Sequence, residues 1–230
     1  ISNEEVEGDD HAHAEGEEHA EGEEHAEEEH HHHGEYNPHV WLDPKRAIQQ
    51  VENIRDGLIA ADPEGEAEYT ANAAAYIAQL KELDAEITST LQPYAGKTFV
   101  AFHDFAPYFA QSYGLEAEFL VDIPEENPSP DDVKRITDEV QASDLKAILT
   151  EPQAGESSFA ALANDLNVTV STFDPLETGG SEALEPAYYL TTMRQNVESL
   201  VTAFGGSTQS FLPTSLLNVA VVPQPVGVRF

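Results

Sequence analysis

The sequence predicts an α/β fold in which a parallel sheet forms one lobe and a long helix runs out of it. Two observations support this prediction. Short apolar segments alternate with helical segments between residues 98 and 171, as in chains that build parallel sheets. Ahead of them, residues 66–91 carry one unbroken apolar stripe at helical spacing.

The helices ahead of the sheet have clear start and stop signals. Asp43 is suited to be an N-cap, with Pro44 at the first helical position. Apolar residues then recur at helical spacing as far as residue 59, and the Asp-Pro-Glu-Gly segment 62–65 ends that helix. At a rise of ~1.5 Å per residue, the helix 66–91 would be roughly 39 Å long, which suits a strut between two lobes.

The remaining elements follow in alternation. We expect strands at 98–102, 118–121, 147–150 and 168–171, and helices between them and after them. In such a sheet, ligands bind beyond the carboxyl ends of the strands. One expected helix includes residues 108–113 and stops at Gly114, and the others begin at residue 130, near residue 157 and at residue 186.

The charge of the chain excludes some partners. It has 230 residues and a formal net charge of -34, so it should bind neither nucleic acid nor anionic membranes. It has no Cys, so a metal would have to be bound by imidazole, carboxylate or water. No apolar run approaches the ~20 residues of a membrane span.

The first 36 residues form a low-complexity tract rich in His and Glu. They contain few apolar residues, and we expect them to be disordered. A flexible His/Glu segment of this kind favours loose, low-affinity binding of divalent metals, although a purification tag or a solvated spacer is the alternative. The histidines of the tract are His11, His13, His19, His25, His30, His31, His32 and His33.

The rest of the chain has two histidines, and both lie at the ends of predicted elements. His39 precedes the first helix, His103 follows the first strand, and Asp174 follows the last strand. Two imidazoles, a carboxylate and one further ligand can make a tetrahedral zinc site. Alternatively, His39 makes a local hydrogen bond and Asp174 is a turn residue. Glu151 is a weaker ligand candidate that we interpret instead as a surface turn residue, and Asp104 is either a helix cap or a partner that orients His103.

Several motifs resemble those of a known family. In their order along the chain, they are similar to the zinc-specific (ZnuA-type) solute-binding proteins of ABC transporters, over about residues 9–204. They follow the His-rich tract and are Asn37-Pro38-His39-Val40-Trp41-Leu42-Asp43-Pro44, Phe102-His103-Asp104-Phe105-Ala106-Pro107-Tyr108-Phe109, Pro128-Ser129-Pro130, Thr150-Glu151-Pro152-Gln153 and Phe173-Asp174-Pro175-Leu176.

The resemblance implies a cluster-A-type fold: two α/β lobes joined by a rigid helix, with Zn²⁺ in the cleft. It matches His39, His103 and Asp174 to metal positions, and manganese-type relatives carry a carboxylate where His103 stands. We therefore expect a fragment that lacks most of the first lobe and that lobe's further His ligand.

The expected domain organisation follows from this comparison. Residues 1–36 are the metal-binding loop, 37–65 the remnant of the N-terminal lobe, 66–94 the linker helix and 95–204 the C-terminal lobe. The apolar tail 205–230 is atypical of the family.

The resemblance also implies a function. We expect a monomeric, non-enzymatic, periplasmic or otherwise extracytoplasmic protein that is exported by a leader absent from this chain. It would bind zinc tightly and deliver it to an ABC permease in the membrane. Two alternatives are a metal-dependent hydrolase, because His39, His103-Asp104 and Asp174 follow the order H…HD…D, and a zinc buffer or chaperone that acts through the His-rich tract alone.

Overall fold

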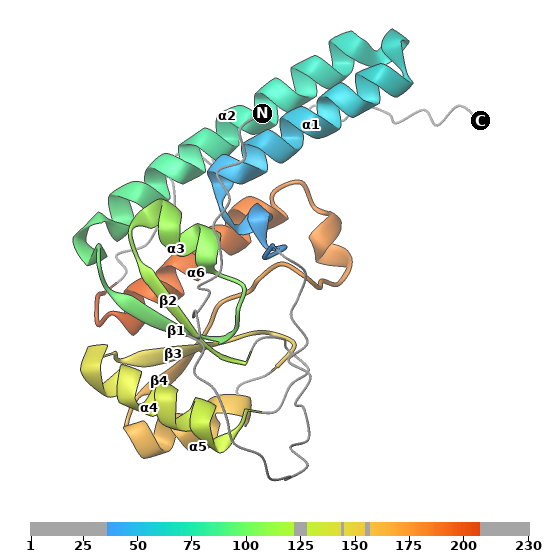
Figure 1. Cartoon of the computed structure of the whole chain (residues 1–230). Helices are drawn as coiled ribbons and strands as arrows, with labels where there is room; N and C mark the ends of the chain where they lie inside the picture. Colours follow the sequence, from blue (N-terminus) through green and yellow to red (C-terminus); the bar gives the residue numbers. More distant parts are fainter. Residues whose placement is uncertain (1–35, 122–127, 144, 155–156, 208–230) are drawn as a thin grey trace, which may run out of the picture.

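The computed structural model describes residues 36–121, 128–143, 145–154 and 157–207 (Figure 1). The eight-histidine tract and nearly all of the tail 205–230 lie outside these residues, so their predicted properties stay predictions. In the described segments, no helix combines the length and apolar character that a membrane crossing requires.

Two long helices form a hairpin along one side of the molecule (Figure 1). A short 3-10 turn, η1 (Val40–Leu42), leads into α1 (Pro44–Ala61), and η2 (Pro63–Gly65) connects it to α2 (Glu66–Leu91). The predicted N-cap is confirmed, because the Asp43 carboxylate accepts a hydrogen bond of 3.0 Å from the Lys45 backbone N–H. The predicted bounds of α2 are confirmed at both ends.

The strands pair in parallel, as predicted. β1 (Thr98–His103) pairs with β2 (Glu116–Val121), and β3 (Ala147–Thr150) pairs with β4 (Thr169–Thr172). The sequence predicts one sheet, whereas the described strands form two hydrogen-bonded pairs. β1 and β3 nevertheless lie side by side, so the carboxyl ends of both pairs meet at a common edge (Figure 1).

Helices cover both faces of these strands (Figure 1). α4 (Pro130–Ser143) and α5 (Ser157–Leu166) pack on one side. α3 (Pro107–Tyr113) and α6 (Tyr188–Ala203) lie on the other side, and both contact α2. The short 3-10 segments η3 (Gln92–Tyr94) and η4 (Ser181–Leu184) complete the described elements.

The core joins α2 to the sheet lobe through one half of the helix. Leu80, Leu83, Ile87 and Leu91 are buried and belong to the same apolar cluster as the strands. Burying each such side chain contributes about 1.5–3 kcal/mol. The C-terminal half of α2 is therefore part of the lobe.

The other half of the hairpin has an exposed apolar surface. Val51, Ile54 and Leu58 of α1 face Tyr69 and Tyr76 of α2 across a groove of about 250 Å³. Ile54 is 61% exposed and Leu58 is 44% exposed. The role of α2 as a strut to another lobe stays a prediction.

Candidate metal centre

His39 is held in place by the residue two positions before it. The Asn37 side-chain oxygen faces the His39 ring Nδ1 at 2.8 Å and accepts a hydrogen bond of 3.0 Å from the His39 backbone N–H. The Asn37 amide in turn donates to the carboxylate of Asp104 at 3.1 Å. Helix α3 has Ala106 as its N-cap, so the interpretation of Asp104 as a helix cap was wrong. Asp104 instead supports the group that orients His39.

His103 is the last residue of β1 and is almost fully buried. Its ring Nδ1 and its backbone N–H both contact Oε1 of Glu151, the latter at 3.1 Å. Glu151 directly follows β3 and has no exposed surface, so its interpretation as a surface turn residue was wrong. A carboxylate that accepts the Nδ1 proton leaves the Nε2 lone pair of His103 available to a metal.

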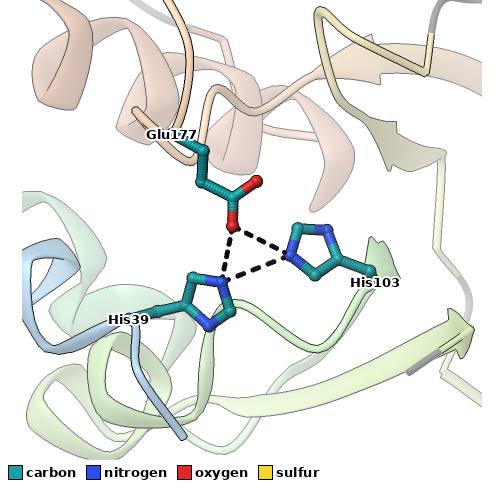
Figure 2. A group of neighbouring side chains, drawn as sticks. All are labelled: His39, His103 and Glu177. Carbon is teal, nitrogen blue, oxygen red and sulfur yellow. Dashed lines mark hydrogen bonds and ion pairs between the residues drawn. The ribbon is translucent and has the colours of Figure 1, made fainter. Parts of the chain in front are cut away.

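The two imidazoles meet a carboxylate that the sequence interpretation missed (Figure 2). Glu177 Oε1 lies 2.6 Å from His39 Nε2 and 3.3 Å from His103 Nε2, and the two Nε2 atoms are 3.3 Å apart. One ligand atom from each residue therefore falls within 4.8 Å of the others. Glu177 lies in the loop after β4, so the group draws on three separate segments of the chain.

Asp174 lies in the same loop, but its carboxylate has other partners. One oxygen accepts a hydrogen bond of 2.8 Å from the Leu176 backbone N–H, and the other lies 3.5 Å from the Tyr188 hydroxyl. Its backbone N–H and carbonyl both bond the Asn196 side chain at 2.8 Å. In the described part of the chain, the group of possible ligands that includes the two histidines contains Glu177 and not Asp174.

The loop that carries Glu177 is tied to the segment that carries His39. The indole N–H of Trp41 donates to the Pro175 carbonyl at 2.8 Å, and the Tyr189 hydroxyl donates to the Trp41 carbonyl at 2.6 Å. These bonds fix both sides of the site relative to each other.

The pKa values of the two histidines shift in opposite directions. Burial lowers the pKa of His39, and the nearby Glu177 offsets this only in part. Burial also disfavours the charged form of His103, but the hydrogen bond and charge of Glu151, with Glu177, outweigh it and raise the pKa of that ring. His39 is therefore poised as a neutral ligand, whereas His103 must lose a proton to bind a metal.

The donor set suits a small divalent cation. Two imidazole nitrogens and one carboxylate oxygen provide three of the four ligands of a tetrahedral site, and the fourth position is open to water or another group. A hydrolase of the H…HD…D type would bring Asp104 and Asp174 to the metal. Among the described residues, neither belongs to the group around the two histidines.

The fold and the site together are those expected of a metal-binding protein, with candidate ligands that converge at the carboxyl edge of parallel strands. Comparison with known proteins shows the family: the model of "Zinc-uptake complex component A periplasmic" (ZnuA) matches residues 2–203, and the chain belongs to this family. Members are metal-binding components of ABC transport systems and not enzymes. The resemblance and fold class predicted from the sequence are thereby confirmed.

Curated relatives include both zinc and manganese proteins. The zinc-binding protein AdcA of Streptococcus pyogenes is 37% identical over 164 residues, which is 70% of this chain and 32% of that protein. The manganese-binding lipoprotein MntA of Halalkalibacterium halodurans is 31% identical over 166 residues, 71% of this chain and 55% of that protein. The chain thus spans about a third to a half of the length of these relatives.

Solved structures agree with this assignment. The Zn(II)-bound ZnuA-like domain of Streptococcus pneumoniae AdcA has a TM-score of 0.64 and 33% identity, covering 75% of this chain and 65% of that chain. The laminin-binding protein Lbp of Streptococcus pyogenes has a TM-score of 0.67 and 32% identity, covering 74% of this chain and 66% of that chain.

Proposed function

We propose that this chain binds Zn²⁺ through His39, His103 and Glu177 and delivers it to an ABC permease. The observation that carries the proposal is the convergence of two Nε2 atoms and one carboxylate oxygen within 4.8 Å. The ion is the cargo of the protein. The assignment of Asp174 as a further ligand stays a prediction, and in the structure that residue braces the loop of Glu177.

The donor chemistry supports zinc over manganese. Imidazole nitrogen suits Zn²⁺, whereas Mn²⁺ favours oxygen donors and a larger number of them. Two of the three converging donors are imidazoles. The zinc-binding AdcA proteins and the Zn(II)-bound ZnuA-like domain point the same way, although MntA is named for manganese.

The family supports a place outside the cytoplasm and a membrane partner. Its description names a periplasmic component of a zinc-uptake complex. We therefore propose that the loaded protein, acting as a monomer, docks on the permease of that complex. The eight-histidine tract would gather zinc near the protein by loose binding.

Replacement of both site histidines tests the proposal. We expect His39→Ala with His103→Ala to abolish the tight zinc site while the weaker sites of the tract remain. The measurement is calorimetric titration of the full chain with zinc, in the presence and absence of a competing chelator. The matched control is His13→Ala with His19→Ala, which removes two tract histidines and should leave the tight site intact. An unchanged tight-site stoichiometry in the first variant refutes the proposal.

A further inference from the structure

Gln153 connects the two carboxylates of the site. Its side-chain Nε2 lies 3.0 Å from Glu151 Oε2 and 3.2 Å from Glu177 Oε2. An amide nitrogen carries two hydrogens, so a single Gln153 side chain can donate to both carboxylates at once. Neither histidine needs to move for these bonds to form.

These bonds divide the oxygens of each carboxylate between two tasks. Glu151 uses Oε1 for His103 and Oε2 for Gln153. Glu177 turns Oε1 toward both imidazoles, and its Oε2 is held by Gln153. A single oxygen of Glu177, Oε1, is therefore free to bind a metal between the two imidazoles.

We propose that Gln153 is a positioning residue that limits Glu177 to one ligand oxygen and thereby favours zinc over manganese. The proposal rests on the proposed zinc site and adds a determinant of its selectivity. Zinc is satisfied by four ligands in a tetrahedron, and one oxygen beside two imidazole nitrogens leaves room for a fourth. Mn²⁺ favours six ligands that are mostly oxygen, so a carboxylate that binds through both oxygens helps Mn²⁺ more than Zn²⁺.

The position of Gln153 makes this idea testable without disturbing the fold. The residue is exposed and lies outside the apolar core, whereas Glu151 beside it is fully buried. Gln153→Met keeps the length of the side chain and removes both donated hydrogen bonds. The released Oε2 of Glu177 can then turn to the metal.

The test compares Zn²⁺ and Mn²⁺ on the full chain with Gln153→Met. Each metal is added at one equivalent or less against a competing chelator, so that the tight site fills before the tract. We expect zinc affinity to fall about tenfold, with manganese affinity unchanged or higher, so the zinc-to-manganese ratio falls by that factor or more. Bound Co²⁺ should lose visible absorption as its coordination rises above four. The matched control is Gln79→Met, because Gln79 is exposed and donates to the Ala75 carbonyl of its own helix at 3.4 Å.

Every other outcome refutes either the proposed function or the role of Gln153. If the unmodified chain has no tight site that depends on His39 and His103, the proposed function fails and this inference fails with it. If that site is present but Gln153→Met keeps the zinc-to-manganese ratio and the Co²⁺ spectrum, the function stands and the role of Gln153 is refuted. An equal loss for both metals would show a supporting role without selectivity, which also refutes the inference.

Discussion

Glu151 should control how tightly His103 binds zinc, and Glu151→Gln tests that effect. The substitution keeps the shape of a fully buried side chain and removes its charge, together with the bond that Oε2 accepts from Gln153 at 3.0 Å. In the loaded site, zinc on Nε2 draws electron density from the His103 ring and makes the Nδ1 proton more acidic. The bond from Nδ1–H to a carboxylate is therefore stronger with metal bound than without it, and an amide oxygen loses most of that gain.

The expected magnitude follows from these contacts. Oε1 of Glu151 accepts both the ring and the backbone N–H of His103. A hydrogen bond to a charged group contributes about 1.5–3 kcal/mol, roughly twice a neutral one, so the variant should lose about 1–2 kcal/mol of zinc binding. That loss corresponds to about a 5- to 30-fold weaker site.

The assay is chelator competition for zinc across a range of pH. Because Glu151 raises the pKa of His103, a proton competes with zinc in the wild-type protein as soon as the pH falls through that raised value. In the variant this competition begins at lower pH, so the wild-type advantage should be largest at high pH and should shrink as the pH falls. Glu86→Gln is the control, because Glu86 pairs with Arg194 at 2.7 Å and not with the site. Equal affinities at high pH, or an advantage that grows toward low pH, would refute the reasoning.

Three further changes test the tract, the core and the support of His39. Zinc binding by a peptide of residues 9–34 should weaken as the pH falls through about 6.5, because imidazole must be neutral to ligate; a pH-independent titration contradicts this. Leu80→Ala should destabilise the chain by about 2–5 kcal/mol in thermal or denaturant unfolding, whereas Leu184→Ala, at a site 86% exposed, should change stability by less than ~0.5 kcal/mol. Asn37→Ala removes the oxygen beside His39 Nδ1 and should weaken zinc binding about tenfold; wild-type affinity would show that Asn37 does not orient the ring.

Much of the fold could be predicted because it depends on local signals. The Asp43-Pro44 pair begins α1 through a side-chain cap and a fixed proline φ. The stripe along α2 predicts its bounds, since an amphipathic helix repeats its apolar residues at a fixed period. His39 and His103 could be selected because they are the two histidines outside the tract and both lie where a predicted element begins or ends.

Glu177 could not be selected in the same way, because its position depends on the path of a loop. Leu176 adopts a φ of 60°, a left-handed conformation that leucine rarely takes and that no propensity predicts. Asp174 stabilises this turn by accepting the Leu176 N–H, so the carboxylate nearer the strand braces the loop while the later one faces the histidines. The sequence nevertheless indicates Glu177 as an alternative ligand, because it is the next acidic residue after Asp174 in the same loop.

Glu151 was ranked below the other candidates for a different reason. A carboxylate before a proline resembles an ordinary turn residue, whereas in the structure this one is buried against His103, 48 positions away. The useful signal is that Glu151 directly follows four fully buried strand residues. An acid that continues such a strand needs a buried partner, and a histidine at the end of the neighbouring strand is a suitable one.

The contact with Glu151 raises the pKa of His103 while burial lowers that of His39, and zinc binding should reveal this difference as a released proton. His39 has a lowered pKa and is already neutral near neutral pH, whereas His103 has a raised pKa and is partly charged. Filling the site between pH 6.5, the ordinary value, and the raised pKa of His103 should therefore release between half a proton and one proton, which comes from His103. The release should decline as the pH rises through that pKa.

Calorimetry in buffers of different ionisation enthalpy measures this number directly, with less than one equivalent of zinc so that the tight site fills first. His103→Gln removes the titrating ring and should abolish the release from this site, and Glu151→Gln should reduce it by lowering the pKa of His103. A release near two protons would mean that His39 is charged as well, which contradicts the lowered pKa that burial gives it. A release that survives in His103→Gln would assign the proton to another group and overturn the division of roles between the two rings.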